Sequence, residues 1–266
     1  MIRGLYTSGN GMISIEKKMD VIANNLANVN KNAYKTDVIT FEAFQDVLTK
    51  RINDTRSSSN PSAELGNMSM GITVGEVYTN YKQGNIVNTG RNLDFAINNS
   101  ESAFFVLMSP DEIQNVRRRT SENENEKYTR DGAFILGPEG HLMSKDGNYV
   151  MGQEGPIVLE GEDFEMNTEG IIKENGVVID TLLIKSFSNT ETLRKQGNSI
   201  VTTTEDTEEE EFKGEILQGY IEHSNVNTVK EMVEMVNIMR SYEANQKILQ
   251  IQDNTLEKAV NLGSVR

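Results

Sequence analysis

The chain has 266 residues, a formal net charge of −14 at pH 7 and no cysteine. The acidic balance, without a basic stripe of interleaved aromatic residues, argues against nucleic-acid binding, and the lack of cysteine excludes disulfides and thiolate metal sites. Because no apolar run approaches the ~18 residues of a membrane-crossing helix, we expect no membrane insertion.

The N-terminal segment carries one helical period without interruption. Apolar residues recur in steps of three and four at Met12, Ile15, Met19, Ile22, Leu26 and Val29. This spacing is typical of a coiled-coil seam. It predicts a helix that starts between residues 3 and 8 and ends near residue 29, where asparagines favour a turn.

Two weaker signals follow this helix. Phe41, Phe44, Val47 and Leu48 have a helical spacing and predict a second, short helix or helical turn. The polar stretch 53–62 is typical of a linker or an exposed loop. Together with the first helix, these segments form the first predicted region, residues 1–69.

Between residues 70 and 217 the apolar period changes to two. Short alternating segments such as 72–78 and short apolar runs such as 104–107 are separated by turns that contain Asp-Gly or Asn-Gly, for example Asn175-Gly176. These pairs are typical of hairpin turns, which need positive φ. The middle region is therefore predicted to be an all-β domain of many short hairpins.

The C-terminal region, residues 218–266, returns to the helical period. Its seam runs through Met232, Met235, Met239, Tyr242, Leu249, Leu256 and Val260. Residues 224–228 supply N-cap side chains, and Gly263 is a stop signal. The predicted fold class is α+β, with long N- and C-terminal helices that form a coiled-coil stalk and an all-β domain inserted between them.

Polar residues lie next to the first seam and interrupt the second. Asn24 and Asn28 lie one turn apart on the first helix, and Gln246 and Asp253 take the corresponding polar places on the last helix. Asparagine is a poor helix former, so one interpretation is a helix end that frays. The functional interpretation is that these side chains bond to neighbouring helices and fix the register and number of partners.

Little in the sequence suggests catalysis. The two histidines, His141 and His223, have no metal-ligand spacing, and we expect no catalytic, cofactor or metal site. Two acidic runs, 122–126 and 205–211, could in principle supply the carboxylate pair of a glycan hydrolase. Adjacent like charges repel and stay solvated, so we interpret both runs as loops.

Several blocks resemble one family, in the expected order along nearly the whole chain. The blocks are residues 1–6, 19–30, 93–97, 128–134, 218–226 and 241–247. They resemble the flagellar axial proteins, and the chain length is closer to basal-body rod proteins of the distal or proximal type than to the hook protein. Residues 110–127 look like an insertion, and Ala33 stands where the family usually has glycine. We therefore expect a different turn there, or one carried by Asn32.

The resemblance implies a structural subunit of the flagellar basal-body rod in the cell envelope. Such a subunit would be exported unfolded through the flagellar type III apparatus, would self-associate into a helical rod and would contact other rod and hook proteins. It implies no cofactor and no enzymatic activity. The two terminal helices would form the inner wall of the tube, and the β domain would face outward.

The seams and the asparagine block define the expected assembly interface. Its residues are Leu5, Met12, Ile15, Met19, Ile22, Asn24, Asn25, Leu26, Asn28, Val29, Met232, Met235, Met239, Tyr242, Gln246, Leu249, Asp253 and Leu256. On this interpretation the chain is built for assembly.

Two other classes of function stay open on the sequence. One is a cell-wall-associated glycan hydrolase with a helical stalk, and the other is a secreted adhesin with a β head that binds a receptor without polymerising. The N-terminal residues lack the apolar core of a secretory signal peptide, so we expect a cytosolic protein or one exported without signal cleavage. Neither alternative explains matching seams at both ends as simply as an axial protein does.

Overall fold

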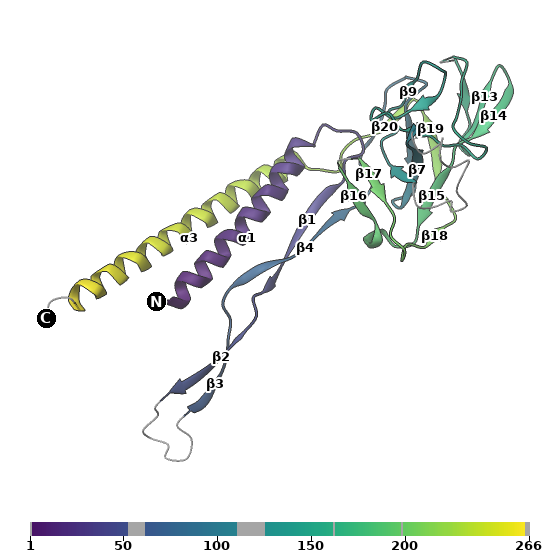
Figure 1. The fold of residues 1–266 in the computed structure, drawn as a ribbon. Helices are drawn as coiled ribbons and strands as arrows, with labels where there is room; N and C mark the ends of the chain where they lie inside the picture. Colours follow the sequence, from purple (N-terminus) through teal and green to yellow (C-terminus); the bar gives the residue numbers. More distant parts are fainter. Residues whose placement is uncertain (1, 53–61, 111–125, 162, 198, 264–266) are drawn as a thin grey trace. The chain divides into compact units, whose positions relative to one another are not determined.

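The chain has a long helix at each end and short strands between them. The structure, a computed structural model, describes residues 2–52, 62–110, 126–161, 163–197 and 199–263 (Figure 1). Helix α1 spans Ile2–Ala27 and helix α3 spans Thr228–Gly263. The predicted α+β class with long terminal helices is confirmed, and both helices end close to the predicted positions.

The chain divides into two compact units. The helical unit contains residues Met1–Leu26, Asp37–Tyr78 and Thr228–Arg266, and the β unit contains Ala27–Thr36 and Thr79–Asn227. The short segment Ala27–Thr36 is thus a brief excursion of the chain into the β unit between two segments of the helical unit.

The helix predicted around residues 41–48 is wrong, because this segment forms strands. β1 (Thr36–Ala43) pairs with β4 (Ile72–Asn80), and β2 (Val47–Ile52) pairs antiparallel with β3 (Ser62–Met68). Three- and four-residue steps between aromatic residues misled the prediction, whereas the β-branched residues Val38, Ile39 and Thr40 favour a strand. The expected loop 53–62 lies outside the described residues, except for Ser62, which begins β3.

The predicted all-β middle region is confirmed as a set of short strands. The strands that follow β4 are β5 (Ile86–Asn88), β6 (Phe95–Asn98), β7 (Ala103–Met108), β8 (Lys127–Thr129), β9 (Ile135–Leu136), β10 (Leu142–Met143), β11 (Tyr149–Val150), β12 (Glu165–Met166), β13 (Ile171–Glu174), β14 (Val177–Thr181), β15 (Ile184–Phe187), β16 (Arg194–Gln196), β17 (Ile200–Thr202), β18 (Glu209–Glu210), β19 (Glu215–Gln218) and β20 (Tyr220–Glu222). A short 3-10 helix, η1, spans Thr190–Thr192. The largest sheet has the order β16-β17-β8-β7-β11-β10-β9, with β15 beside β7 and β18 beside β15.

Strand β7 lies at the centre of this sheet and contributes to two cores. Phe105 and Leu107 belong to one apolar cluster, whereas Phe104 and Val106 belong to the other. Successive side chains of a strand point to opposite faces, so a strand covered on both faces is apolar at every position. This arrangement explains the uninterrupted apolar run that the sequence shows at residues 104–107.

The turn predicted at Asn175-Gly176 is present. It joins β13 to β14, and both of its residues have positive φ, 51° for Asn175 and 81° for Gly176. A two-residue hairpin with positive φ at both positions is the type I′ turn that Asn-Gly favours, because its twist matches that of the paired strands. The hairpin shows that local turn chemistry determines much of the β unit.

One residue of each acidic run forms an ion pair with the same lysine. Lys185 Nζ lies 2.8 Å from Glu126 and 2.8 Å from Glu209, and the Glu126 side chain is only 11% exposed. Burial acts to lower the pKa of Lys185, but the hydrogen bonds to Glu126 and Glu209 outweigh it and raise the pKa. The rest of the first run and most of the possible insertion at 110–127 lie outside the described residues.

Candidate assembly interface

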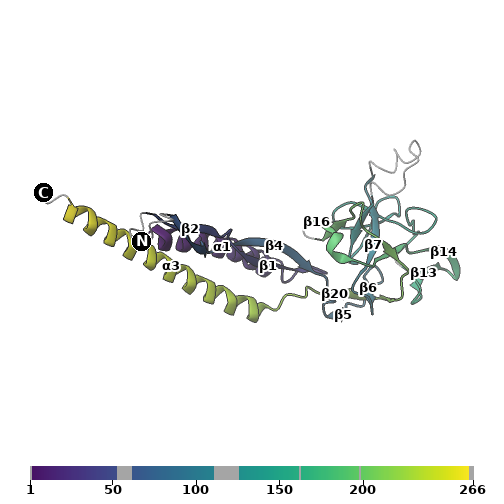
Figure 2. The same ribbon diagram turned by 90° about the horizontal axis from the view of Figure 1, so that it is seen from below.

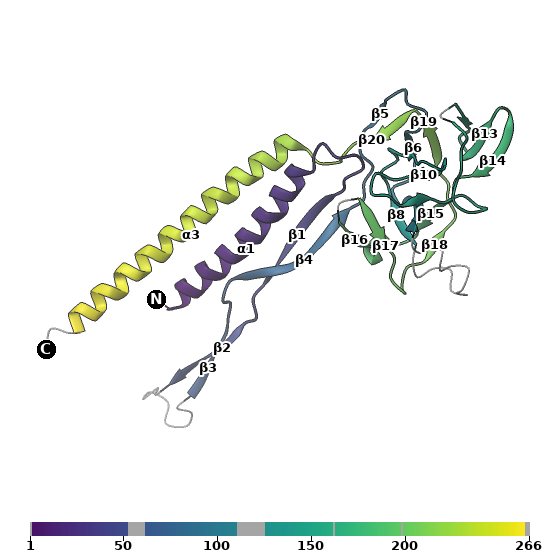
Figure 3. The same ribbon diagram turned by 45° about the horizontal axis from the view of Figure 1, so that its top comes forward.

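Helices α1 and α3 of the helical unit pack antiparallel along a polar and small-residue column. A Cβ placed on Gly4 would lie 3.0 Å from Nε2 of Gln252, and one placed on Gly11 would lie 3.5 Å from Nδ2 of Asn245. Nearer the other end of α1, Lys18 forms a 2.5 Å ion pair with Glu234. The contact moves toward the N-terminus of α3 as it moves along α1, and the step from Gly4 and Gln252 to Gly11 and Asn245 is one heptad on each helix. Figures 1 and 3 show the two helices side by side.

We call this contact the inner column. It comprises Gly4, Gly11 and Lys18 on α1 and Glu234, Asn245 and Gln252 on α3, all of which are buried or half-buried. Among the described residues of the helical unit, Ile22 and Ile238 are the buried apolar side chains. Apolar residues of the same two helices are half-buried, among them Ile15, Met235 and Tyr242, so the helix pair combines polar contacts with partial apolar burial.

A second column on the same two helices is apolar, and half of its residues are exposed. This outer column comprises Leu5, Met12, Met19 and Leu26 on α1 and Met232 and Met239 on α3. Leu5 is 38%, Met239 45% and Met232 50% exposed, and the other members are half-buried. Large apolar side chains are usually among the most buried in a protein, so a row of exposed ones marks an interaction surface.

The ribbon of β1 and β4 covers a different side of α1. Asn10 donates from Nδ2 to the carbonyl of Met70 at 3.3 Å, and Ser14 donates to the carbonyl of Ile72 at 3.2 Å. Asn25 exchanges two hydrogen bonds with the backbone of Asp37, at 2.9 and 3.0 Å. Figure 2, seen at right angles to Figure 1, shows α1 against this ribbon. The polar residues of α1 thus satisfy the ribbon backbone, and the outer column stays uncovered.

The structure places the predicted interface residues in three environments. Buried are Ile22, Asn25 and Asn28; half-buried are Met12, Ile15, Met19, Leu26, Val29, Met235, Tyr242, Leu249 and Leu256; exposed are Leu5, Asn24, Met232, Met239, Gln246 and Asp253. Apolar spacing predicted the apolar residues of both helices. It could not predict the inner column, because Gly4 and Gly11 carry no apolar signal. Whether these residues meet other copies stays a prediction.

In the β unit, a buried cluster of charges gathers chain segments that are far apart in sequence. The carboxylate of Glu222 lies 2.7 Å from Lys35 Nζ and 2.8 Å from Arg130 Nε, and it also accepts the Gly84 amide at 2.7 Å. All three charged side chains are at most 5% exposed. Arg130 donates further to the carbonyls of Ala103, Ile97 and Ser100.

The charges of this cluster shift one another's pKa. Burial lowers the pKa of Lys35 to about 8, even though Glu222 acts in the opposite direction, and Arg130 lowers it further. Burial acts to raise the pKa of Glu222, but Arg130 and Lys35 outweigh it and lower the pKa. Glu222 is therefore the acceptor on which both cations depend.

Asn225 extends the cluster to the points where the chain enters and leaves the β unit. Its Oδ1 accepts from the amide and hydroxyl of Thr36 at 2.8 and 2.6 Å, and its Nδ2 donates to the carbonyls of Asn80 and Lys82 at 2.8 and 3.0 Å. We call Lys35, Arg130, Glu222 and Asn225 the junction cluster. No sequence periodicity signals it, but three of its members fall in the blocks that carry the family resemblance.

Ala33 stands next to the junction cluster in a left-handed conformation, with φ of 52°. Its amide donates to the carbonyl of Glu222 at 2.8 Å, and its side chain is buried. The turn after α1 is therefore carried by Ala33 itself rather than by Asn32. Glycine would adopt this φ without strain.

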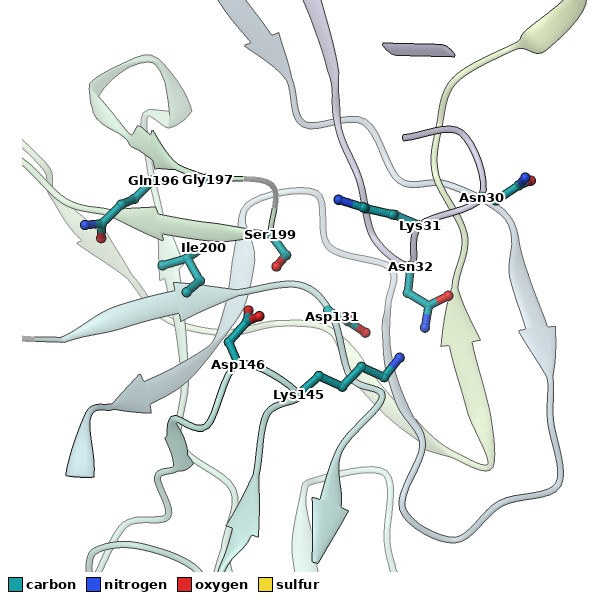
Figure 4. A pocket seen from close by; sticks show the side chains of 10 residues that line it. All are labelled: Asn30, Lys31, Asn32, Asp131, Lys145, Asp146, Gln196, Gly197, Ser199 and Ile200. Atoms are coloured by element: carbon teal, nitrogen blue, oxygen red, sulfur yellow. The ribbon is translucent and has the colours of Figure 1, made fainter. Parts of the chain in front are cut away.

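A polar cleft of about 580 Å³ opens beside this turn (Figure 4). Lys31 and Asn32 line it from the segment after α1, and Asp131, Lys145 and Asp146 line it from turns of the β unit. Burial raises the pKa of Asp131. The cleft balances two lysines against two aspartates. Across the described part of the chain, no group of three or more His, Cys, Asp or Glu residues could hold a metal ion.

Two long terminal helices that pack along each other and carry exposed apolar residues are typical of a structural protein that binds other chains. Residues 5–35 match the family model described as flagella basal body rod protein, and residues 217–262 match the C-terminal model of the flagellar basal body rod FlgEFG proteins. No helix in the described ranges is long and apolar enough to cross a membrane.

Full-length relatives support the same assignment. The chain is 31% identical over 276 residues to the flagellar basal-body rod protein FlgG of Buchnera aphidicola subsp. Schizaphis graminum, covering 98% of this chain and all of that one. It is 26% identical to the flagellar hook-basal body complex protein FlhO of Bacillus subtilis, over 98% of both chains. It is also 26% identical to FlgF of Caulobacter vibrioides, over 97% of this chain and 95% of that one.

The chain belongs to the flagellar basal-body rod family. It is a structural subunit of the rod and is not an enzyme, so the glycan hydrolase and the adhesin are set aside. Relatives that are named as rod and hook-basal body proteins imply that it assembles with other rod or hook proteins.

Proposed function

We propose that this subunit polymerises helically by burying its outer column against the terminal helices of neighbouring copies. The observation that carries the proposal is the exposure of Leu5, Met232 and Met239 on two helices that already pack against each other. Each such side chain stabilises an interface by roughly 1.5–3 kcal/mol when fully buried. The exposed side chains contribute little to the stability of the free chain, and their burial would stabilise the polymer.

The geometry of a repeated contact then leads to a filament. One copy offers the outer column, and a different surface of the next copy covers it, so the contact is head-to-tail. Such contacts build an open helix whenever the rotation between copies does not close a ring. The β1–β4 and β2–β3 ribbon offers further exposed apolar residues, among them Phe44, Val47 and Tyr78, for contacts within the same assembly.

We also propose export in an unfolded state through the flagellar type III apparatus, as the family resemblance implies. The lack of cysteine suits delivery into an oxidising space, because no wrong disulfide can form. Fusion of a stably folded domain to the C-terminus tests this route. The fusion should remain inside the cell while the unfused chain is exported; efficient export of the folded fusion would contradict the proposal.

The test of polymerisation uses two matched substitutions on α3. Met239→Asp places a charge in the outer column, and Ile251→Asp places the same charge at a residue that is 62% exposed outside the column. Hook-basal bodies are purified from cells that carry either variant in place of the wild-type gene. Met239→Asp should abolish complete rods, and Ile251→Asp should allow them.

Circular dichroism of the purified variants verifies that the β unit is folded in both. Complete rods containing Met239→Asp subunits would overturn the role of the outer column. Loss of rods in both variants would overturn its specificity, because any charge on α3 would then suffice.

A further inference from the structure

The contacts in the β unit suggest how a weak helix pair forms at all. Helices α1 and α3 lie about 200 residues apart in sequence, and closing a loop of that length is entropically costly. Glycine, amide and charged side chains take part in their mutual contact, and the apolar side chains buried among the described residues of this unit are Ile22 and Ile238, so apolar burial offsets only part of this cost. Something else must bring the two chain segments together.

The junction cluster joins the segments that lead into the two helices. The backbone amide of Ala33 donates to the Glu222 carbonyl at 2.8 Å, and the backbone amide of Asn225 donates to the Tyr34 carbonyl at 3.2 Å. Asn32 and His223 form an isolated antiparallel β-bridge. Residues 28–32 separate α1 from Ala33, and only Val226 and Asn227 separate Asn225 from α3. With the cluster formed, the helices are connected by a few residues on either side.

We propose that the junction cluster is a tether that pre-organises the α1–α3 pair, although none of its residues belongs to either helix. Its members are positioning residues. Replacing a loop of about 200 residues by one of about 10 raises the effective concentration of one helix at the other by roughly a hundredfold, because closure scales with the −3/2 power of loop length. Asn225 has the larger part in this, since it also binds Thr36 and the returning strand β4 at Asn80.

The test measures helix pairing directly. The chain has no cysteine, so a Gly11→Cys/Asn245→Cys chain carries one thiol on each helix at a point of contact. The rate of closure by a short thiol crosslinker reports the effective concentration of the two helices. In this background Asn225→Ala and Glu222→Gln should each slow closure by at least about fivefold, up to the hundredfold limit of chain statistics.

The matched control is Glu208→Gln, which removes the same charge from an exposed residue and should leave the rate unchanged. Hydrogen exchange at β7 verifies in each variant that the β unit is folded. Unchanged closure in a folded Asn225→Ala or Glu222→Gln chain would overturn the tether.

A reciprocal measurement covers the case in which both variants unfold. If the cluster favours helix pairing, then helix pairing favours the cluster by the same factor. Crosslinking the helices in the otherwise unchanged chain should therefore slow hydrogen exchange at the amides of Ala33 and Gly84, both of which bind Glu222. Equal exchange at these amides before and after crosslinking would show that the two features are independent.

Discussion

The β unit and the helical unit of this chain are stabilised in different ways. The largest fully buried side chains, from Tyr34 and Phe95 to Phe187, all lie in the β unit, together with a buried ion cluster. Among the described residues of the helical unit, the buried apolar side chains are Ile22 and Ile238. The β unit is thus complete within one chain, whereas the helical unit leaves its apolar column uncovered.

The two units of one chain therefore depend on different sources of stability. A core that is closed within the subunit gives a folded building block. In the proposed assembly, neighbouring copies cover the outward-facing apolar residues of the helices, so the stability of the helical unit would depend on assembly. The following changes separate the two kinds.

The largest effect is expected from Glu222→Gln. Removing this carboxylate charge leaves Lys35 and Arg130 buried without their counter-charge, and breaking a buried ion pair in this way costs about 3–5 kcal/mol. Urea unfolding followed by tyrosine fluorescence should show the loss in the β unit. Glu208→Gln is the control, and equal unfolding midpoints for both variants would contradict the importance of the cluster.

Two truncations, one in each unit, test whether the units differ in this way. Phe105 is fully buried and packs edge-on against Phe134 at 5.4 Å, so Phe105→Ala should lower the free energy of unfolding by about 3–5 kcal/mol. Met239→Ala removes an exposed side chain and should change it by less than about 0.5 kcal/mol in the free chain. Met239→Ala should nevertheless impair rod formation. A large loss of stability in the free Met239→Ala chain would mean that the outer column is already covered.

The pH dependence of stability reports on Lys35. Burial lowers its pKa in the folded chain to about 8 from the ordinary 10.5, and Glu222, Arg130 and Glu101 act on the same group. Between these two pH values the unfolded chain binds one more proton than the folded chain, so the free energy of unfolding rises with pH. The expected rise is about 1–3 kcal/mol from pH 8 to 10.5.

Lys35→Met isolates this contribution from other titrating groups. The difference in unfolding free energy between wild type and Lys35→Met should shift in favour of wild type as the pH rises from 7.5 to 9.5. A difference that is constant with pH would show that Lys35 keeps its ordinary pKa.

The smallest effect is expected from Ala33→Gly. A non-glycine residue in the left-handed region costs about 1–2 kcal/mol, and the extra freedom of glycine in the unfolded chain offsets about half of the gain. A net stabilisation of about 0.5 kcal/mol should appear in thermal unfolding. The same substitution at Ala103, a buried strand residue, should destabilise instead.

Elements whose sequence pattern fits only one local structure could be predicted from the sequence. The three- and four-residue steps gave both terminal helices, and Asn175-Gly176 gave a hairpin. Spacing alone failed at Phe41 and Phe44, where a strand pairs with β4, because pairing with a distant segment decides the conformation.

The sequence could not show which part of each apolar stripe faces the other helix. Glycines at 4 and 11 allow the close approach, and they carry no apolar signal. The junction cluster lay beyond prediction for a different reason. Lys35 and Arg130 are 187 and 92 residues from Glu222, and only the fold brings them together. The position of Arg130, Glu222 and Asn225 inside blocks that resemble the family was the one signal that pointed to it.

Hydrogen exchange on the free and the polymerised subunit tests the central claim most directly. We expect the β7 amides to be equally protected from exchange in both states. The amides of residues 12–26 in α1 should exchange fast in the free chain and slowly in the rod. Equal protection of α1 in the free chain and in the rod would contradict it, because the helical unit would then be complete without its neighbours.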